Sequence, residues 1–166
     1  MLENSFIHIQ GIGETTERSL WEQGIRSWTD LEASAAEVLG PKRSQLCLLA
    51  LEESRAALES GEIGYFQSRL SGQNSWRMIP HCEDSIAYLD IETTGLGFPP
   101  QSHSTTVAVS FRGELIVEHD KAKKRELFER LNEEAKMWVT FNGLSFDMPF
   151  LRREFKIPLA QPHVDL

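Results

Sequence analysis

The chain has 166 residues and a net charge of −8 at neutral pH, with 40% hydrophobic and 25% charged residues. This composition is ordinary for a globular protein, and the length fits one domain with a small additional module. The negative charge disfavours broad electrostatic binding of nucleic acid, so any such contact has to be local.

The sequence shows no targeting or membrane-spanning segment. No apolar run reaches the length of a membrane span, and residues 1–3 carry no basic region leading into an apolar core. Cys47 and Cys82 lack the spacing of metal ligands, so we expect reduced thiols. These features predict a cytoplasmic protein with no membrane partner.

The first third of the chain, residues 1–62, predicts a small helical module. Residues 6–13 lead into a helical run that ends at Gly24, and a longer helix begins at Pro41 and ends at Gly61. The glycines of the Gly11-Ile12-Gly13 stretch allow a tight turn. This start resembles a helix-hairpin-helix motif, in which backbone N–H groups approach a phosphate, and it makes Gly11 and Gly13 candidate phosphate contacts.

Two acidic residues complicate that interpretation. Glu14 and Glu17 occupy the first turns after the glycines, where DNA-binding hairpins commonly carry Lys or Arg. Their carboxylates oppose a phosphate. A module that packs or contacts another protein and a module that binds DNA both remain open. Residues 63–80, rich in Gly, Ser, Asn and Pro, are interpreted as a connector that packs on the domain.

The most informative segment is Tyr88-Leu89-Asp90-Ile91-Glu92-Thr93-Thr94-Gly95-Leu96. Alternation along a strand places Asp90 and Glu92 on one face. Two adjacent like charges are costly unless a cation lies between them, and hard oxygen ligands suit magnesium or manganese. A strand-end carboxylate pair alone also fits a structural cap or a strand end in water.

A third carboxylate follows 57 residues after Asp90. An apolar strand ends at Asn142-Gly143, and a helix starting near Ser145 carries Asp147 in its first turn. Taken alone, such an acid also fits a simple favourable interaction with the positive end of its own helix.

Together these segments resemble the first two motifs of the DEDD (DnaQ-like) 3′–5′ exonucleases, which have a ribonuclease-H-like α/β fold. The Asn-Gly-x-x-Phe-Asp-x-Pro-Phe-Leu form at residues 142–151, followed by His163-Val164-Asp165-Leu166, is most similar to the YprB-type domains. The resemblance covers residues from about 63 onward.

The resemblance implies a metal-dependent phosphodiester hydrolase with two Mg²⁺ or Mn²⁺ ions held by Asp90, Glu92 and Asp147. It also implies that Thr94 and Leu96 contact the 3′-terminal nucleotide of a single strand of DNA or RNA. Asn142 and Phe146 either shape the wall of that pocket or hold the fold. Arg152 and Arg153 directly follow the second motif and are candidate phosphate contacts.

The predicted elements of residues 81–166 agree with the first part of a ribonuclease-H-like mixed sheet. They are strands at about 86–91, 105–111 and 114–118, a helix at 123–134, a strand at 136–141 and a helix at 145–155. A final strand-and-helix unit is expected after Leu166, leaving one sheet edge exposed.

The chain also departs from the family. A fourth acid, preceded by His or Tyr four or five residues earlier, is absent, since His163 and Asp165 have the wrong spacing. We therefore expect a C-terminally truncated catalytic domain. A catalytically inactive module that binds nucleic acid or protein is the alternative, and another nuclease of ribonuclease-H-like fold is disfavoured by the spacing of the second motif.

Overall fold

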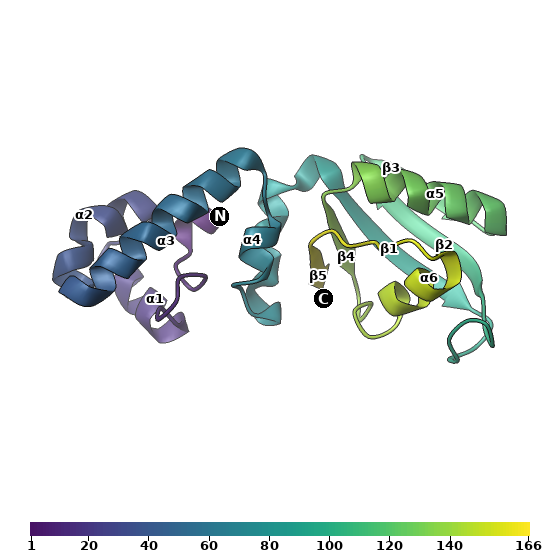
Figure 1. Cartoon of the computed structure of the whole chain (residues 1–166), viewed down its shortest axis with the longest axis horizontal. Helices are drawn as coiled ribbons and strands as arrows, with labels where there is room; N and C mark the ends of the chain where they lie inside the picture. The colour runs from purple at the N-terminus through teal and green to yellow at the C-terminus, as the bar shows by residue number, and fades with distance from the viewer. The chain divides into compact units, whose positions relative to one another are not determined.

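The computed structural model describes residues 1–166, and the chain divides into two compact units, Met1–His81 and Cys82–Leu166 (Figure 1). The first unit is helical and the second is built on one sheet. No helix combines the length and the apolar character that crossing a membrane requires.

The first unit contains helices α1 (Glu14–Glu22), α2 (Trp28–Leu39), α3 (Pro41–Ser60) and α4 (Gly64–Gln67), with short 3-10 helices at Leu2–Asn4 and Gly72–His81. Local signals set the helix ends. Ser27 and Asp30 form a reciprocal capping box at the start of α2. Pro41 is the first residue of α3, and Gly61 ends it with a φ of 73°, a left-handed conformation that glycine adopts without strain.

The core of the first unit includes side chains from residues 63–80. Phe66 and Met78 are fully buried, and Phe66 stacks on Trp28 of α2 with ring centroids 6.2 Å apart. The segment interpreted as a connector therefore packs within the first unit.

The second unit begins with a 3-10 helix at Glu83–Ser85, which leads into a five-stranded sheet in the order β3-β2-β1-β4-β5. Its strands are β1 (Ile86–Thr93), β2 (Ser104–Phe111), β3 (Glu114–Glu118), β4 (Met137–Thr140) and β5 (His163–Asp165). The strands β1, β2 and β3 form an antiparallel meander, whereas β4 pairs parallel with both β1 and β5.

Helices α5 (Lys121–Glu134) and α6 (Asp147–Phe155) cover one face of this sheet (Figure 1). Their apolar side chains pack on alternate residues of the strands, and the resulting core contains Leu89, Ile91, Val107, Val109, Leu127, Phe128, Leu131, Trp138, Met148, Leu151 and Phe155. On the opposite face Tyr88, Leu115 and Val117 are exposed. Burial on one face explains the period-two pattern of β1 and β2.

The predicted fold class, a mixed α/β sheet preceded by a helical module, is confirmed. Element boundaries differ by one or two residues from those predicted, which is usual at frayed ends. The strand β5 was not predicted from the sequence. Three residues with little local pattern become a strand only because β4 offers a partner edge.

Candidate metal and nucleic-acid site

The first two predicted carboxylates lie at the end of β1, on its exposed face. Leu89 and Ile91 point into the core, so Asp90 and Glu92 point away from it and are exposed. The pairing of β1 with β4 reaches only to Tyr88, opposite Val139. The residues of β1 that follow Tyr88 have no strand partner on the β4 side.

Asp147 interacts with this unpaired part of β1. It is the first residue of α6 and is buried, with 7% of the residue exposed. Burial raises the pKa of its carboxyl, and the nearby charges of Asp90 and Asp165 raise it further. Hydrogen bonds to the backbone of Asp147 itself and of Ile91 oppose that rise. Asp147 thus lies close enough to Asp90 for the two charges to interact.

These acids lack cationic partners within the protein. The five ion pairs of the chain involve other residues. No group of three or more His, Cys, Asp or Glu side chains is close enough to hold a metal ion. Asp90 and Asp147 nevertheless fit a hard divalent cation chemically, since a cation relieves both their mutual repulsion and the burial of Asp147.

The loop between β4 and α6 holds Asn142 and Phe146. Asn142 has a left-handed φ of 56°, and its Oδ1 accepts a 2.9 Å hydrogen bond from the Ser145 hydroxyl. Phe146 packs against Phe150 and Phe98 at centroid distances of 5.5 and 6.0 Å. These contacts correspond to the fold-holding alternative for both residues.

Thr94 and Leu96 follow β1 in an exposed loop. The Thr94 amide donates to the His103 carbonyl oxygen at 3.0 Å, and its hydroxyl accepts from the His103 amide at 3.2 Å. Leu96 is 89% exposed. Both side chains are accessible to a ligand that approaches the end of β1.

The two arginines predicted to meet phosphate differ in the structure. Arg152 donates from Nε to the Pro158 carbonyl oxygen and from Nη2 to that of Leu159, both at 2.8 Å. It closes the turn after α6. The Arg153 guanidinium lies 4.1 Å from the centre of the Phe98 ring and carries no carboxylate partner.

The acidic start of α1 requires a correction. Glu17 is 2% exposed, and its carboxylate accepts from the Phe6 amide at 2.6 Å and from Arg77 at 2.9 Å. Glu14 accepts from the Asn74 side chain at 3.0 Å. Glu17 is therefore turned inward and neutralised, and it does not oppose a phosphate. Sequence analysis missed this because Arg77 lies 60 residues away.

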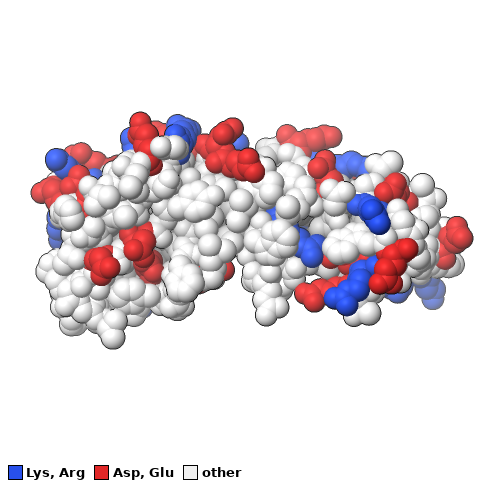
Figure 2. Space-filling model, turned by 180° about the vertical axis from the view of Figure 1, so that it is seen from behind, with Lys and Arg blue, Asp and Glu red and all other residues white.

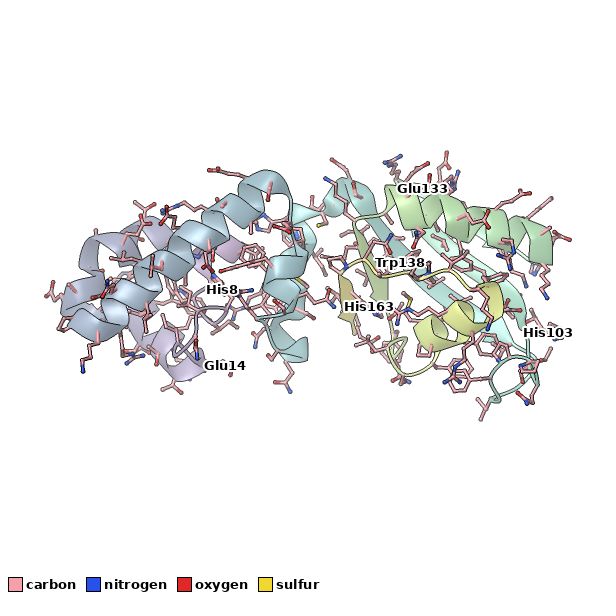
Figure 3. All side chains as sticks on the ribbon, in the orientation of Figure 1. His8, Glu14, His103, Glu133, Trp138 and His163 are labelled. Carbon is pink, nitrogen blue, oxygen red and sulfur yellow. The ribbon has the colours of Figure 1, made fainter.

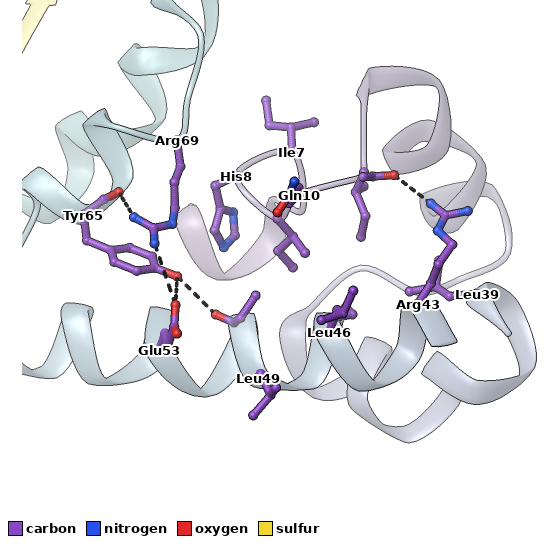
Figure 4. A pocket seen from close by; sticks show the side chains of 15 residues that line it. Ile7, His8, Gln10, Leu39, Arg43, Leu46, Leu49, Glu53, Tyr65 and Arg69 are labelled. Atoms are coloured by element: carbon purple, nitrogen blue, oxygen red, sulfur yellow. Dashed lines mark hydrogen bonds and ion pairs between the residues drawn. The ribbon is translucent and has the colours of Figure 1, made fainter. Parts of the chain in front are cut away.

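The predicted phosphate contacts Gly11 and Gly13 frame the turn before α1. Gly11 has a φ of 87°, and its carbonyl oxygen accepts from Arg43 Nη2 at 2.7 Å. The turn borders a cleft of about 850 Å³ in the first unit, formed by residues 7–12, one side of α3, Tyr65 and Arg69 (Figure 4). Leu46 and Leu49 of α3 are exposed along it.

His8 forms part of the inner wall of this cleft (Figures 3 and 4). Its Nε2 lies 3.0 Å from the Ser54 hydroxyl, which itself donates to the Ala50 carbonyl oxygen. Nε2 must therefore carry the proton. Burial, reinforced by the charges of Arg69 and Arg77, lowers the pKa of His8 to about 4, so it is neutral at pH 7.

Surface charge agrees with local rather than broad binding of polyanions. On the face that Figure 2 shows, Lys and Arg side chains are scattered among Asp and Glu instead of forming one patch. This is the arrangement expected from the net charge of −8.

The sequence did not predict the hydrogen bonds of His163 and Asp165. Asp165 ends β5 directly opposite Thr140 of β4, and its Oδ1 accepts from the Thr140 hydroxyl at 2.8 Å and from the Gly143 amide at 2.7 Å. The Leu144 amide donates to Oδ2 at 3.2 Å. Both oxygens thus accept hydrogen bonds from the loop before α6 or from β4. The His-x-Asp spacing on a strand parallel to β4 was the available signal.

Comparison with known families agrees with this architecture. The family model RNase_H_2, described as RNase_H superfamily, matches residues 87–166. The match supports a ribonuclease-H-like domain in the second unit, and that class suggests a nuclease-type function on nucleic acid with divalent metals. No curated protein and no solved structure matches the chain.

Proposed function

We propose that the second unit is a DEDD-type 3′–5′ exonuclease domain of the YprB kind. The observation that carries the proposal is the burial of Asp147 within electrostatic range of Asp90, with no ion-pair partner in the protein. A buried acid near another acid destabilises a fold, so such a pair often marks a functional site. Binding of a cation would offset the cost.

In this proposal Asp90, Glu92 and Asp147 hold Mg²⁺ or Mn²⁺. When bound, such ions activate a water and stabilise the leaving 3′ oxygen of a phosphodiester. Thr94 and Leu96 orient the terminal nucleotide of a single strand, with Leu96 as an exposed apolar contact. Arg153, free of carboxylate partners, is the better of the two arginine candidates for a phosphate.

The test of the site is a manganese titration of the 166-residue chain by calorimetry. We expect wild-type binding that Asp90→Asn and Asp147→Asn each weaken by at least about tenfold, since each removes a ligand. Asp84→Asn is the matched control, because Asp84 is an exposed acid of the same unit with no ion-pair partner. Equal binding by all four proteins would refute the assignment of these acids.

The test of the activity uses 3′-labelled single-stranded DNA and RNA in the presence of Mn²⁺. Release of nucleoside 5′-monophosphates from the 3′ end that both substitutions abolish would support the exonuclease, and comparison of the two substrates would determine the preferred nucleic acid. Sequence features do not distinguish DNA from RNA, because none of them contacts a 2′-hydroxyl.

A second candidate function is a catalytically inactive module that binds nucleic acid or a protein. It is favoured by the absence of a group of three or more potential metal ligands. Binding of a single strand without cleavage, unchanged by Asp147→Asn, would favour this function. The helical first unit is a candidate for the protein contact in either case.

A further inference from the structure

The carboxylate of Asp165 lies at the centre of a hydrogen-bonded chain that joins β5 to the loop before α6. The Thr140 hydroxyl gives its single proton to Asp165 Oδ1 and lies 2.7 Å from His163 Nε2. Since that proton is used, His163 Nε2 must be the donor to Thr140. The hydrogen bonds therefore run from His163 through Thr140 to Asp165. The Asp165 carboxylate also accepts hydrogen bonds from the amides of Gly143 and Leu144.

This series of hydrogen bonds is buried, and it is tightly packed around the Thr140 side chain. Thr140 and His163 are 3% and 5% exposed. A Cβ atom on Gly143 would lie 2.4 Å from Thr140 Oγ1, so the loop runs directly against the Thr140 side chain. Such close contact fixes the backbone position of residue 143 relative to β4.

The same loop leads directly to Asp147. The Met148 amide donates to the Gly143 carbonyl oxygen at 2.9 Å, so the residue held by Asp165 also begins the first turn of α6. Asp147 lies between them in the sequence, and the backbone of Ile91 on β1 is near enough to its carboxylate to lower its pKa. The position of the Asp147 carboxylate thus depends on where Gly143 is held.

We propose that the His163–Thr140–Asp165 chain positions Asp147 at the metal site and that Asp165 is a positioning residue rather than a ligand. The inference rests on the proposed function for its consequence in metal binding, whereas the positioning itself is measurable without metal. A carboxylate that organises a ligand-bearing loop typically affects metal affinity by about 10- to 100-fold.

The decisive variant is Thr140→Val, which keeps the shape and every charge but removes the hydroxyl. Thr140→Ser retains the hydroxyl and is the matched rescue variant. Glu126→Gln, at an exposed acid on α5, controls for general effects of substitution in this unit. Asp165→Asn is a second route, because its amide nitrogen replaces one accepting oxygen and leaves the rest of the side chain in place.

Amide hydrogen exchange of the full chain without metal is the first readout. In Thr140→Val the amides of Gly143 and Leu144 should exchange at least about tenfold faster, and so should the amide of Ile91, which reports on Asp147 from another strand. Thr140→Ser should restore all three. Should Thr140→Val fail to fold, Asp165→Asn is read in the same way. Unchanged Ile91 exchange while the loop amides lose protection would overturn the proposal, as would no change at any of them.

Manganese affinity is the second readout. If wild type binds Mn²⁺, Thr140→Val should weaken binding by at least about tenfold and Thr140→Ser by less than about twofold. Equal weakening by both would overturn the positioning role. If wild type binds no Mn²⁺, the proposed function fails, while the exchange of the Ile91 amide still decides whether Asp165 positions Asp147.

Discussion

Gly143→Ala tests how closely the loop before α6 is packed against β4. The added Cβ would lie 2.4, 2.5 and 2.8 Å from Oγ1, Cβ and Cγ2 of Thr140. All three distances are far below ordinary contact, and Thr140 cannot rotate away without leaving His163 and Asp165. The backbone of residue 143 therefore has to move.

The expected cost follows from two effects. Overpacking by one methyl group against fixed neighbours costs about 1–3 kcal/mol. Moving the Gly143 amide away from the Asp165 carboxylate removes a charge-assisted hydrogen bond worth about 1.5–3 kcal/mol. Because relaxation lowers the sum, we expect a loss of roughly 3 kcal/mol in the free energy of unfolding of the second unit, or about 2–3 M in the urea midpoint.

The assay is urea denaturation followed by the NMR signal of the Trp138 indole N–H, which donates to Gln161 at 2.9 Å and reports on the second unit alone. Gly95→Ala is the matched control in the same unit, since its new Cβ would meet its nearest atom at an ordinary 3.4 Å. It should change stability by less than about 0.5 kcal/mol. Equal effects of the two substitutions would refute the steric reasoning.

Three further predictions concern buried charges. Asp147→Asn should raise stability without metal at neutral pH, because burial and Asp90 raise the pKa of Asp147, and the gain should vanish as pH falls below the ordinary carboxyl pKa; pH-dependent urea denaturation measures it. Arg77→Met should destabilise the first unit by about 3–5 kcal/mol, since it leaves the carboxylate of Glu17 buried and unpaired, and tryptophan fluorescence should show it; a loss below 1 kcal/mol would contradict the buried pair. Because the pKa of His8 is lowered to about 4, the unfolded chain binds a proton before the folded unit does as the pH falls. About 3 kcal/mol in the free energy of unfolding of the first unit should therefore be lost between pH 6.5 and 4. His8→Leu should flatten this part of the pH dependence of stability, which calorimetry measures.

The sequence by itself determined most of the local structure and the first pair of acids. Alternation along residues 86–93 placed Asp90 and Glu92 on the exposed face of β1, because side chains of a strand point to opposite faces in turn. Pro41 and Gly61 marked the ends of α3, because each restricts or permits particular backbone angles wherever it occurs.

Tertiary structure decided the features that depend on partners distant in sequence. β5 exists because β4 offers it an edge, and Asp165 accepts amides 21 and 22 residues earlier in the chain. The charge of Glu17 is compensated only because Arg77, 60 residues later in the sequence, pairs with its carboxylate. Local periodicity carries no record of such contacts, since a carboxylate facing water, a cation or a backbone amide has the same sequence pattern.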